Sequence, residues 1–409
     1  MRTLTDVREM NARSERWNTR LVGHHDLNGH GDGMQLLKVG PYCYVAHLGV
    51  HDMALSILDC SDPSAPKLVR QIPHFENTHS HKVQIAGNLL IQNLERPYFA
   101  QRTPGAARHQ AGILLYDLTD PTDPRPIGRF EVEGAGVHRM WMVDGKYAHV
   151  ASTWPGYHER VYLIVDVSDP TQPKAVGIWH IPGTKDGEEP EWLWFPGQHA
   201  YVHGVIVEGN RAYVSCVDAG TAIVDISDLA HPKTISHINW HPPYGGYCHT
   251  SMPLPSRGLV LAVCESVKET VAEDGDKRIW VIDVREERQP VIISSFPRPR
   301  PAPGLPWQDY DERPLRFGPH NVHELRPHYG YRSEYLIFST WYNAGLRITD
   351  LSDPSRPEEV GYFVPPPPEG QAAPQINDLF VDNDRLIYLT DRYNGGLYIV
   401  EYEGPDITP

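Results

Sequence analysis

The stretch YLIVDVSDPTQPKAVG, residues 162–177, combines an apolar run, a proline-rich turn and a second short apolar run. Its Val, Ile, Leu and Tyr residues favour strands. The Asp and Ser side chains can bond backbone amides in a turn, and each proline removes an amide donor. The segment is therefore expected to form two strands joined by a tight turn.

The same pattern recurs along the chain. Its other copies are LSILDCSDPSAPKLV (55–69), ILLYDLTDPTDPRPIG (113–128), AIVDISDLAHPKTI (222–235), IWVIDVREERQPVII (279–293) and LRITDLSDPSRPEEVG (346–361). Two further short strands precede each copy, as in HKVQIAGNLLIQNL (81–94), where Gly-Asn makes the hairpin turn. Four antiparallel strands per repeat are what a propeller blade requires.

These repeats predict an all-β fold, a single seven-bladed β-propeller domain over residues 1–409. The expected blades are 33–73, 81–133, 138–182, 203–240, 249–296, 320–364 and 377–402, with 1–16 as an N-terminal extension. The last blade supplies only three strands. Residues 17–23, WNTRLVG, resemble the fourth strands of other blades and are expected to close the ring, which removes exposed sheet edges. An open solenoid or two sandwiches are the alternatives.

This pattern resembles the LVIVD-repeat β-propeller proteins, in the core LIVDVSDP (163–170) and over nearly the whole chain. Two other segments, HELRP (323–327) and NDRLIYLTDRYNGGLYIVEY (383–402), are similar to the selenium-binding protein and methanethiol oxidase family. The second resemblance implies, by analogy, a copper site. The Cys-rich N-terminal motifs of that family are absent from this sequence.

Histidines begin the first strand of five consecutive blades. Because the first strand of each blade lines the central channel, residues at this position converge near the ring axis. The five are His81, His138, His203, His249 and His320. His323 lies three residues beyond His320, where alternation along a strand points it to the opposite side unless the strand starts later. All six are candidate metal ligands.

Several neutral imidazoles favour a transition metal over calcium or magnesium. Because no thiolate accompanies them, copper or iron is expected rather than structural zinc. The five cysteines are scattered without metal-ligand spacing and are expected to be buried apolar residues. The alternative is that the histidines cap strand ends by hydrogen bonding in a wet channel.

Loops after the second strands are expected to rim the same face as the axial histidines. They offer an aromatic wall for substrate, with Trp154, Tyr157, Trp341, Tyr342 and Tyr393. Arg392 suits a substrate carboxylate, and Glu95 is another polar member of the rim. The candidate proton carriers are Glu265, Glu324 and Asp378, and Asn377 and Asp32 are candidates to orient the ligands.

A net charge of -15 without any Lys/Arg-rich run argues against a nucleic-acid partner. No apolar run approaches the roughly 20 residues needed to cross a bilayer, and the charged N-terminal segment does not resemble a signal peptide. The chain is thus expected to be cytoplasmic, with a small-molecule substrate and no membrane partner. Its oligomeric state is left open.

The functional hypothesis is an oxidoreductase that uses copper or non-haem iron on a small organic substrate, either aromatic or bearing a carboxylate. A metal-assisted hydrolase, lyase or isomerase would need the same ligands without a redox change. A non-enzymatic binding scaffold is the third reading, although a scaffold has no need of axial histidines.

Overall fold

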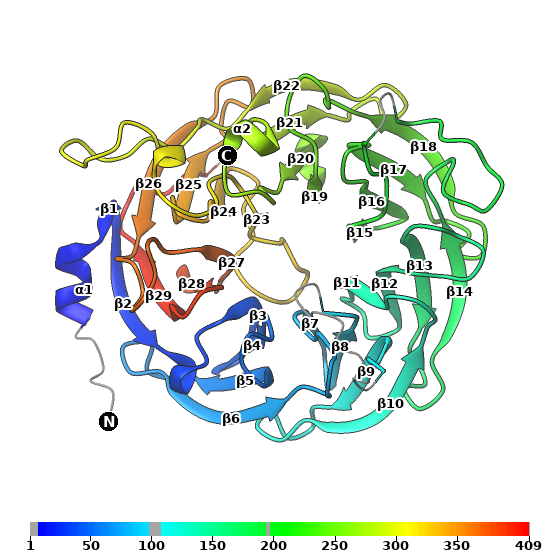
Figure 1. The fold of residues 1–409 in the computed structure, drawn as a ribbon, viewed down its shortest axis with the longest axis horizontal. Coiled ribbons are helices and arrows are strands. Elements are labelled where there is room, and N and C mark those ends of the chain that lie inside the picture. The colour runs from blue at the N-terminus through cyan, green and yellow to red at the C-terminus, as the bar shows by residue number, and fades with distance from the viewer. Residues whose placement is uncertain (1–6, 98–107, 194–196, 409) are drawn as a thin grey trace.

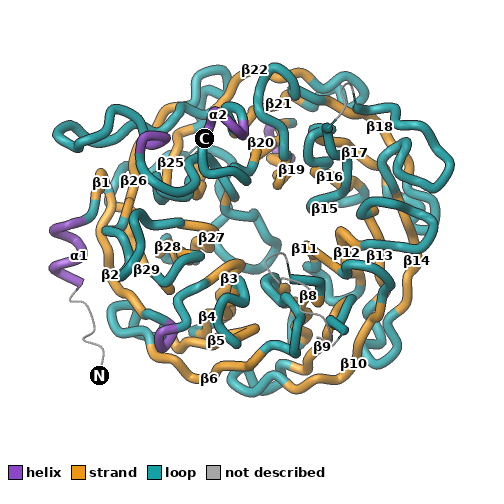
Figure 2. Tube along the Cα trace, in the orientation of Figure 1, coloured by secondary structure: helices purple, strands orange, loops and turns teal. Residues whose placement is uncertain are grey.

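Seven antiparallel β-sheets surround a central axis like the blades of a propeller (Figure 1). The computed structural model describes residues 7–97, 108–193 and 197–408. Strands and loops make up almost all of the described chain, and its few helices are short (Figure 2). The predicted seven-bladed propeller is therefore confirmed.

Blades 1 to 4 each contain four sequential strands. Blade 1 has β3 (Gly33–Val39), β4 (Tyr42–His47), β5 (Met53–Asp59) and β6 (Lys67–Pro73). Blade 2 has β7 (Val83–Ala86), β8 (Leu89–Leu94), β9 (Gly112–Asp117) and β10 (Arg125–Glu131). Blade 3 has β11 (Val137–Trp141), β12 (Tyr147–Ser152), β13 (Val161–Asp166) and β14 (Lys174–Trp179). Blade 4 has β15 (Gly204–Glu208), β16 (Arg211–Ser215), β17 (Thr221–Asp225) and β18 (Lys233–Ile238).

Blade 5 likewise contains four sequential strands, β19 (Cys248–Leu254), β20 (Leu259–Cys264), β21 (Ile279–Asp283) and β22 (Val291–Ser295).

Blades 6 and 7 differ because each receives a strand from the start of the chain. Blade 6 has β23 (Asn321–Val322), β24 (Leu336–Thr340), β25 (Leu346–Asp350), β26 (Glu358–Val364) and the added β1 (Glu15–Trp17). Blade 7 has β27 (Ile376–Val381), β28 (Leu386–Asp391), β29 (Gly396–Tyr402) and the N-terminal β2 (Thr19–His25).

Helices lie outside the blades. They are α1 (Val7–Arg13), α2 (Val271–Asp274) and three 3-10 turns at Leu27–Gly29, Pro255–Arg257 and Tyr310–Glu312. Neither described α-helix has the length or the apolar character needed to span a bilayer.

Aspartates hold the repeated turns between the third and fourth strands. In blade 3 the carboxylate of Asp166 accepts hydrogen bonds from the backbone amide of Ser168 (2.9 Å) and from its hydroxyl (2.6 Å). Asp169 accepts the same pair from Thr171. The turn is thus fixed by its own side chains, which explains why Asp and Ser or Thr recur in five of the six copies of the repeat; the copy at 279–293 has Arg285 in place of the Ser or Thr.

The ring closes where β2 pairs antiparallel with β29, with Leu21 opposite Val400. This confirms the closing strand, although it covers Thr19–His25 rather than 17–23. Asn18 adopts a left-handed backbone (φ 52°) that ends β1 and separates it from β2. As a result, the preceding residues Glu15–Trp17 pair instead with β26 of blade 6. The start of the chain therefore joins two blades.

Replacing Leu21 by Ala should destabilise the propeller by about 2–4 kcal/mol, because this side chain is buried in the core that closes the ring. Its neighbour Arg20 lies on the exposed side of the same strand and pairs with Glu401 and Glu403. Arg20→Ala is therefore the matched control and should lower the free energy of unfolding by less than about 1 kcal/mol. Urea unfolding measures both. Equal losses for the two variants would contradict the assigned role of β2.

Candidate metal centre

The five axial histidines all line one cavity of about 200 Å³ at the inner ends of the blades. His138 and His249 lie in β11 and β19, while His203 and His320 immediately precede β15 and β23. His81 lies two residues before β7. Each is at most 6% exposed. The remaining lining residues are Met34, Leu48, His79, Lys82, Tyr247, Glu265, Val267, Arg316 and Arg392.

Neighbouring blades bring successive imidazole rings into contact. The ring centroids are 5.0 Å apart for His81 and His138, and 4.5 Å apart for His138 and His203. From His203 to His249, and from His249 to His320, the separation is 4.3 Å. The repeat register thus produces a continuous arc of imidazoles around the cavity.

His138 and His203 present unprotonated nitrogens to each other. The Nδ1 of His138 lies 3.0 Å from the carboxylate of Glu95, and the Nδ1 of His203 lies 3.2 Å from the backbone carbonyl of His249. A carboxylate or a carbonyl only accepts, so each Nδ1 carries the proton of a neutral imidazole. Yet the two Nε2 atoms are only 3.0 Å apart. Two lone pairs in such contact repel unless a cation lies against both.

His320 is held in the same tautomer, because its Nδ1 donates to the backbone carbonyl of Asn377. Its Nε2 keeps its lone pair, and an acceptor on the far side orients the ring, as is usual for metal-ligating histidines. His249 differs, because its Nδ1 lies 3.0 Å from the Nη1 of Arg139, which only donates, and 2.7 Å from the hydroxyl of Thr250. The Nδ1 of His249 therefore accepts from Arg139.

A shared proton is a poor alternative to a metal between these nitrogens. Burial lowers the pKa of all four imidazoles well below 6.5, and nearby cations and imidazoles lower each pKa further. The four are His138, His203, His249 and His320. Since all are neutral at neutral pH, the donor set fits a copper or iron ion, whose ligands must be deprotonated.

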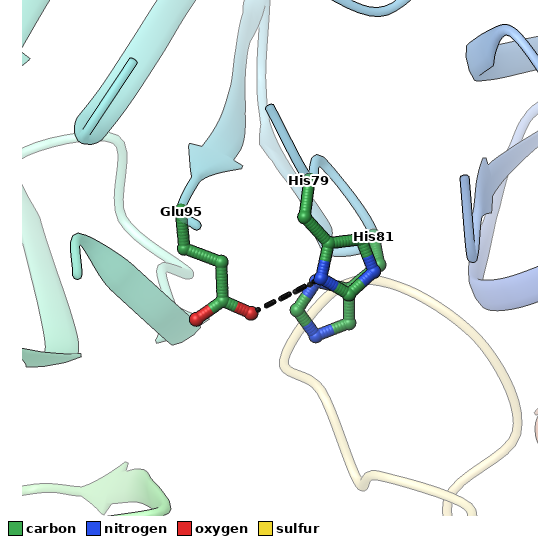
Figure 3. A group of neighbouring side chains, drawn as sticks. All are labelled: His79, His81 and Glu95. Carbon is green, nitrogen blue, oxygen red and sulfur yellow. Dashed lines mark ion pairs between the residues drawn. The ribbon is translucent and has the colours of Figure 1, made fainter. Parts of the chain in front are cut away.

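His81 belongs to a second group, with His79 and Glu95 (Figure 3). The rings of His79 and His81 stack with centroids 4.0 Å apart, and each Nδ1 lies within 3.5 Å of the Glu95 carboxylate. The Nδ1 of His81 also faces the amide nitrogen of Asn93 at 3.2 Å. That amide is a donor, because the oxygen of Asn93 accepts from the backbone of Lys82. The Nδ1 of His81 therefore lies between an amide donor and a carboxylate acceptor.

Glu265 is the only carboxylate among the described residues that line the cavity. It lies 3.9 Å from the Nε2 of His203 and 3.9 Å from that of His320. The Tyr342 hydroxyl donates to its Oε1 at 2.7 Å and in turn accepts from Arg392 at 2.9 Å. The predicted proton carrier Glu265 and the predicted substrate ligand Arg392 are thus both at the site.

Glu324 lies outside the cavity lining and joins two buried guanidinium groups. Arg139 donates to its Oε1 at 2.6 Å, and Arg326 donates to its Oε2. Burial by itself would raise the pKa of Glu324, but the two cations lower it to about 2. Arg139 also donates to the backbone carbonyl of His249, passing over Gly204, where a Cβ would lie 2.8 Å from its Cδ. Glu324 therefore remains ionised and holds Arg139, which in turn supports the backbone of His249.

Asp378 also lies behind the imidazoles. It accepts from the side-chain amide of Asn321 at 2.6 Å, and Asn321 accepts from Thr250, the hydroxyl partner of His249. Burial raises the pKa of Asp378 to about 6. Its connection to the cavity runs through this hydrogen-bonded chain, which orients His249. Asp32 orients a different histidine, His47, at 2.8 Å.

His323 is directed away from the cavity, as strand alternation predicts. Its Nε2 lies 2.8 Å from the carbonyl of Tyr331, and its Nδ1 accepts from the backbone amide of Val381. Its ring packs edge-on against Phe380. Of the pair His320 and His323, only His320 lines the cavity.

The expected aromatic wall lies mostly elsewhere. Trp341 is buried in the core of blades 5 and 6, and Trp154 stacks on Phe130 in a separate surface pocket. Tyr157 packs near His180, and Tyr393 is half-buried outside the cavity lining. The tyrosines that reach the site are Tyr247, which lines it, and Tyr342, which contacts His320.

Four polar lining residues had not been singled out from the sequence: His79, Lys82, Tyr247 and Arg316. His79 carries a signal, since it stands two residues before His81 and so shares its side of an extended segment. Lys82 directly follows His81, whereas Tyr247 and Arg316 lie in irregular segments whose path no repeat pattern specifies.

Four segments match the model of the LVIVD repeat: residues 30–72, 139–180, 199–239 and 341–364. The chain contains LVIVD repeats. The copies at 113–128 and 279–293 lie outside these segments, yet they form equivalent strands in blades 2 and 5. These comparisons give no support to the likeness to the selenium-binding protein and methanethiol oxidase family. No curated protein matches the chain.

Solved structures with a similar fold have very different sequences. The β-propeller domain of Cps50 (Swd1) from Myceliophteria thermophila is 12% identical, with a TM-score of 0.56 over 91% of this chain and 96% of that one. Sqt1 from Saccharomyces cerevisiae is 8% identical, with a TM-score of 0.52 over 92% and 97%. A functionally unknown protein from Desulfotomaculum acetoxidans is 12% identical, with a TM-score of 0.51 over 91% and 90%. These likenesses concern the fold alone.

Glu324→Gln should reduce the free energy of unfolding at pH 7 by about 3–5 kcal/mol, because it leaves Arg139 and Arg326 buried without a counter-charge. The depressed pKa means that the stabilisation is present above pH 4.5 and declines as the pH falls toward 2. Urea unfolding should therefore show a smaller difference from wild type at pH 3 than at pH 7.

The exposed pair Arg356 and Glu358 provides the control. Glu358→Gln should change stability by less than about 1 kcal/mol at either pH. A loss for Glu324→Gln that is the same at pH 3 and pH 7 would contradict the ion-pair explanation.

Proposed function

We propose that His138, His203 and His320 hold a transition-metal ion through Nε2, with His249 beside them, and that the protein is an oxidoreductase using copper or non-haem iron on a small organic substrate. The observation that carries the proposal is the 3.0 Å contact between the Nε2 atoms of His138 and His203 while each Nδ1 faces an acceptor. Neutral imidazoles without thiolate are a common ligand set for these two metals. Such an ion supplies one-electron chemistry when bound.

The residues of the site have separable tasks. Glu95 and the backbone carbonyls of His249 and Asn377 orient three of the imidazoles. The burial of the cavity wall limits access of bulk water to the reacting groups. Glu265 is placed to accept a proton from substrate at Oε2, since the Tyr342 hydroxyl occupies its Oε1.

Metal analysis of protein purified without a polyhistidine tag tests the proposal, with His320→Ala and His323→Ala as a matched pair. His320→Ala should reduce the affinity for copper or iron about tenfold or more, because it removes a ligand. His323→Ala should leave the metal content unchanged, because both of its nitrogens are bonded on the far side of the strand. Less than about a tenth of an equivalent of any transition metal in the wild type would contradict the proposal.

A redox role is distinguished from metal-assisted hydrolysis by spectroscopy and oxygen consumption. We expect the metal-loaded protein to show a visible absorption band or a paramagnetic signal that disappears on reduction and returns in air. A stoichiometrically loaded protein that shows no reversible redox change would instead support hydrolytic, lyase or isomerase chemistry at the same residues.

A further inference from the structure

The axial cavity contains an excess of positive charge that the protein does not neutralise. Three cationic side chains line it, Lys82, Arg316 and Arg392, against the single carboxylate of Glu265. Other carboxylates near the axis have partners outside the cavity, since Glu324 pairs with two arginines and Glu95 lies 3.7 Å from Arg160. Asp378 accepts a hydrogen bond from Asn321 and has no ion pair with Lys82 within 4.0 Å. Buried charges are ordinarily paired, because desolvating an isolated ion is costly.

Lys82 is the clearest case. It is 3% exposed, and within the described parts of the chain its ammonium has neither a hydrogen-bond acceptor nor a carboxylate within 4.0 Å. Other shielded lysines differ: Lys38 lies 3.2 Å from Asp382, and Lys277 lies 3.2 Å from Asp274. Lys82 therefore faces the cavity without a hydrogen bond or a close ion pair, and only the more distant carboxylates of Asp378 and Glu265 act on its charge.

The two arginines leave donors open to the same space. Both share Glu265, at 3.7 Å for Arg316 and 4.0 Å for Arg392, which is too long for a hydrogen bond. Arg392 donates one bond to the Tyr342 hydroxyl, and its buried Nε has no acceptor among the described residues. Guanidinium groups bind carboxylates through paired donors, so these side chains are suited to a planar anionic group.

We propose that the axial cavity binds a small organic carboxylate, whose charged group lies against Lys82, Arg316 and Arg392 and whose other end faces the imidazoles. The apolar lining residues Met34, Leu48 and Val267 suit an uncharged remainder, and the volume of about 200 Å³ restricts the ligand to a small molecule. As a statement about the substrate, this inference rests on the proposed function. As a statement about anion binding, it stands on the cavity alone.

Benzoate and its uncharged isostere benzamide test the charge requirement by calorimetry, with acetate and phosphate as further probes. We expect benzoate or acetate to bind at least tenfold more tightly than benzamide. Lys82→Met and Arg392→Gln should each weaken carboxylate binding about 10- to 100-fold, the size of a hydrogen bond to a charged group. Lys38→Met, outside the cavity, is the control and should leave carboxylate binding unchanged.

Thermal unfolding gives an independent measure. Without added anion, Lys82→Met should unfold at the same temperature as wild type or higher, because it removes an unpaired buried charge. Benzoate or acetate should raise the melting temperature of the wild type and not of Lys82→Met. Equal binding of benzoate and benzamide, no response to any carboxylate, or tighter binding of phosphate than of either carboxylate would overturn the inference.

The same experiments on chelator-treated protein separate the two proposals. Lys82-dependent carboxylate binding in a protein that never holds metal would overturn the proposed function and leave the carboxylate site standing. Stoichiometric metal in a protein that shows no preference for carboxylates would instead support the metal site and overturn the carboxylate site.

Discussion

The hydrogen bonds between β2 and β29 tie the start of the chain to its last blade, and the positions of the axial residues depend on that closure. A closed ring holds the inner strand of every blade at a fixed place around the axis. The first residues of β11, β15, β19 and β23 therefore converge although they lie far apart in the sequence. A set of five histidines, separated by 46 to 71 residues, becomes one arc of touching rings.

Convergence alone does not make these imidazoles metal ligands. The hydrogen-bond acceptors behind the rings also determine which ring nitrogen keeps its lone pair. Glu95 and two backbone carbonyls leave Nε2 unprotonated on His138, His203 and His320. Behind them, Arg139 connects the His249 backbone to Glu324. The cationic groups that line the same cavity would repel a metal ion, so a bound carboxylate reconciles the imidazoles with Lys82, Arg316 and Arg392.

The sequence predicted the features that repeat and missed those that do not. Apolar runs followed by Asp-Pro turns predicted the blades, and the same register placed His138, His203, His249 and His320 at the axis. Alternation along a strand separated His320 from His323. The predicted aromatic wall included the loop residues Trp154 and Trp341, and both pack away from the site. The direction of a loop depends on tertiary packing, which the repeat pattern does not specify. Arg316 and Tyr247 lie in irregular segments, where no periodicity indicates which side chain turns inward.

The central claim is that a metal ion bridges imidazoles from several blades, and anomalous diffraction from crystals grown without added metal tests it most directly. The account predicts a peak at a copper or iron absorption edge within about 2.0–2.2 Å of the Nε2 atoms of His138 and His203. It also predicts that this peak is absent from crystals of His203→Ala. A wild-type crystal with no anomalous density on the axis, and with the two Nε2 atoms joined by an ordinary hydrogen bond, would contradict it.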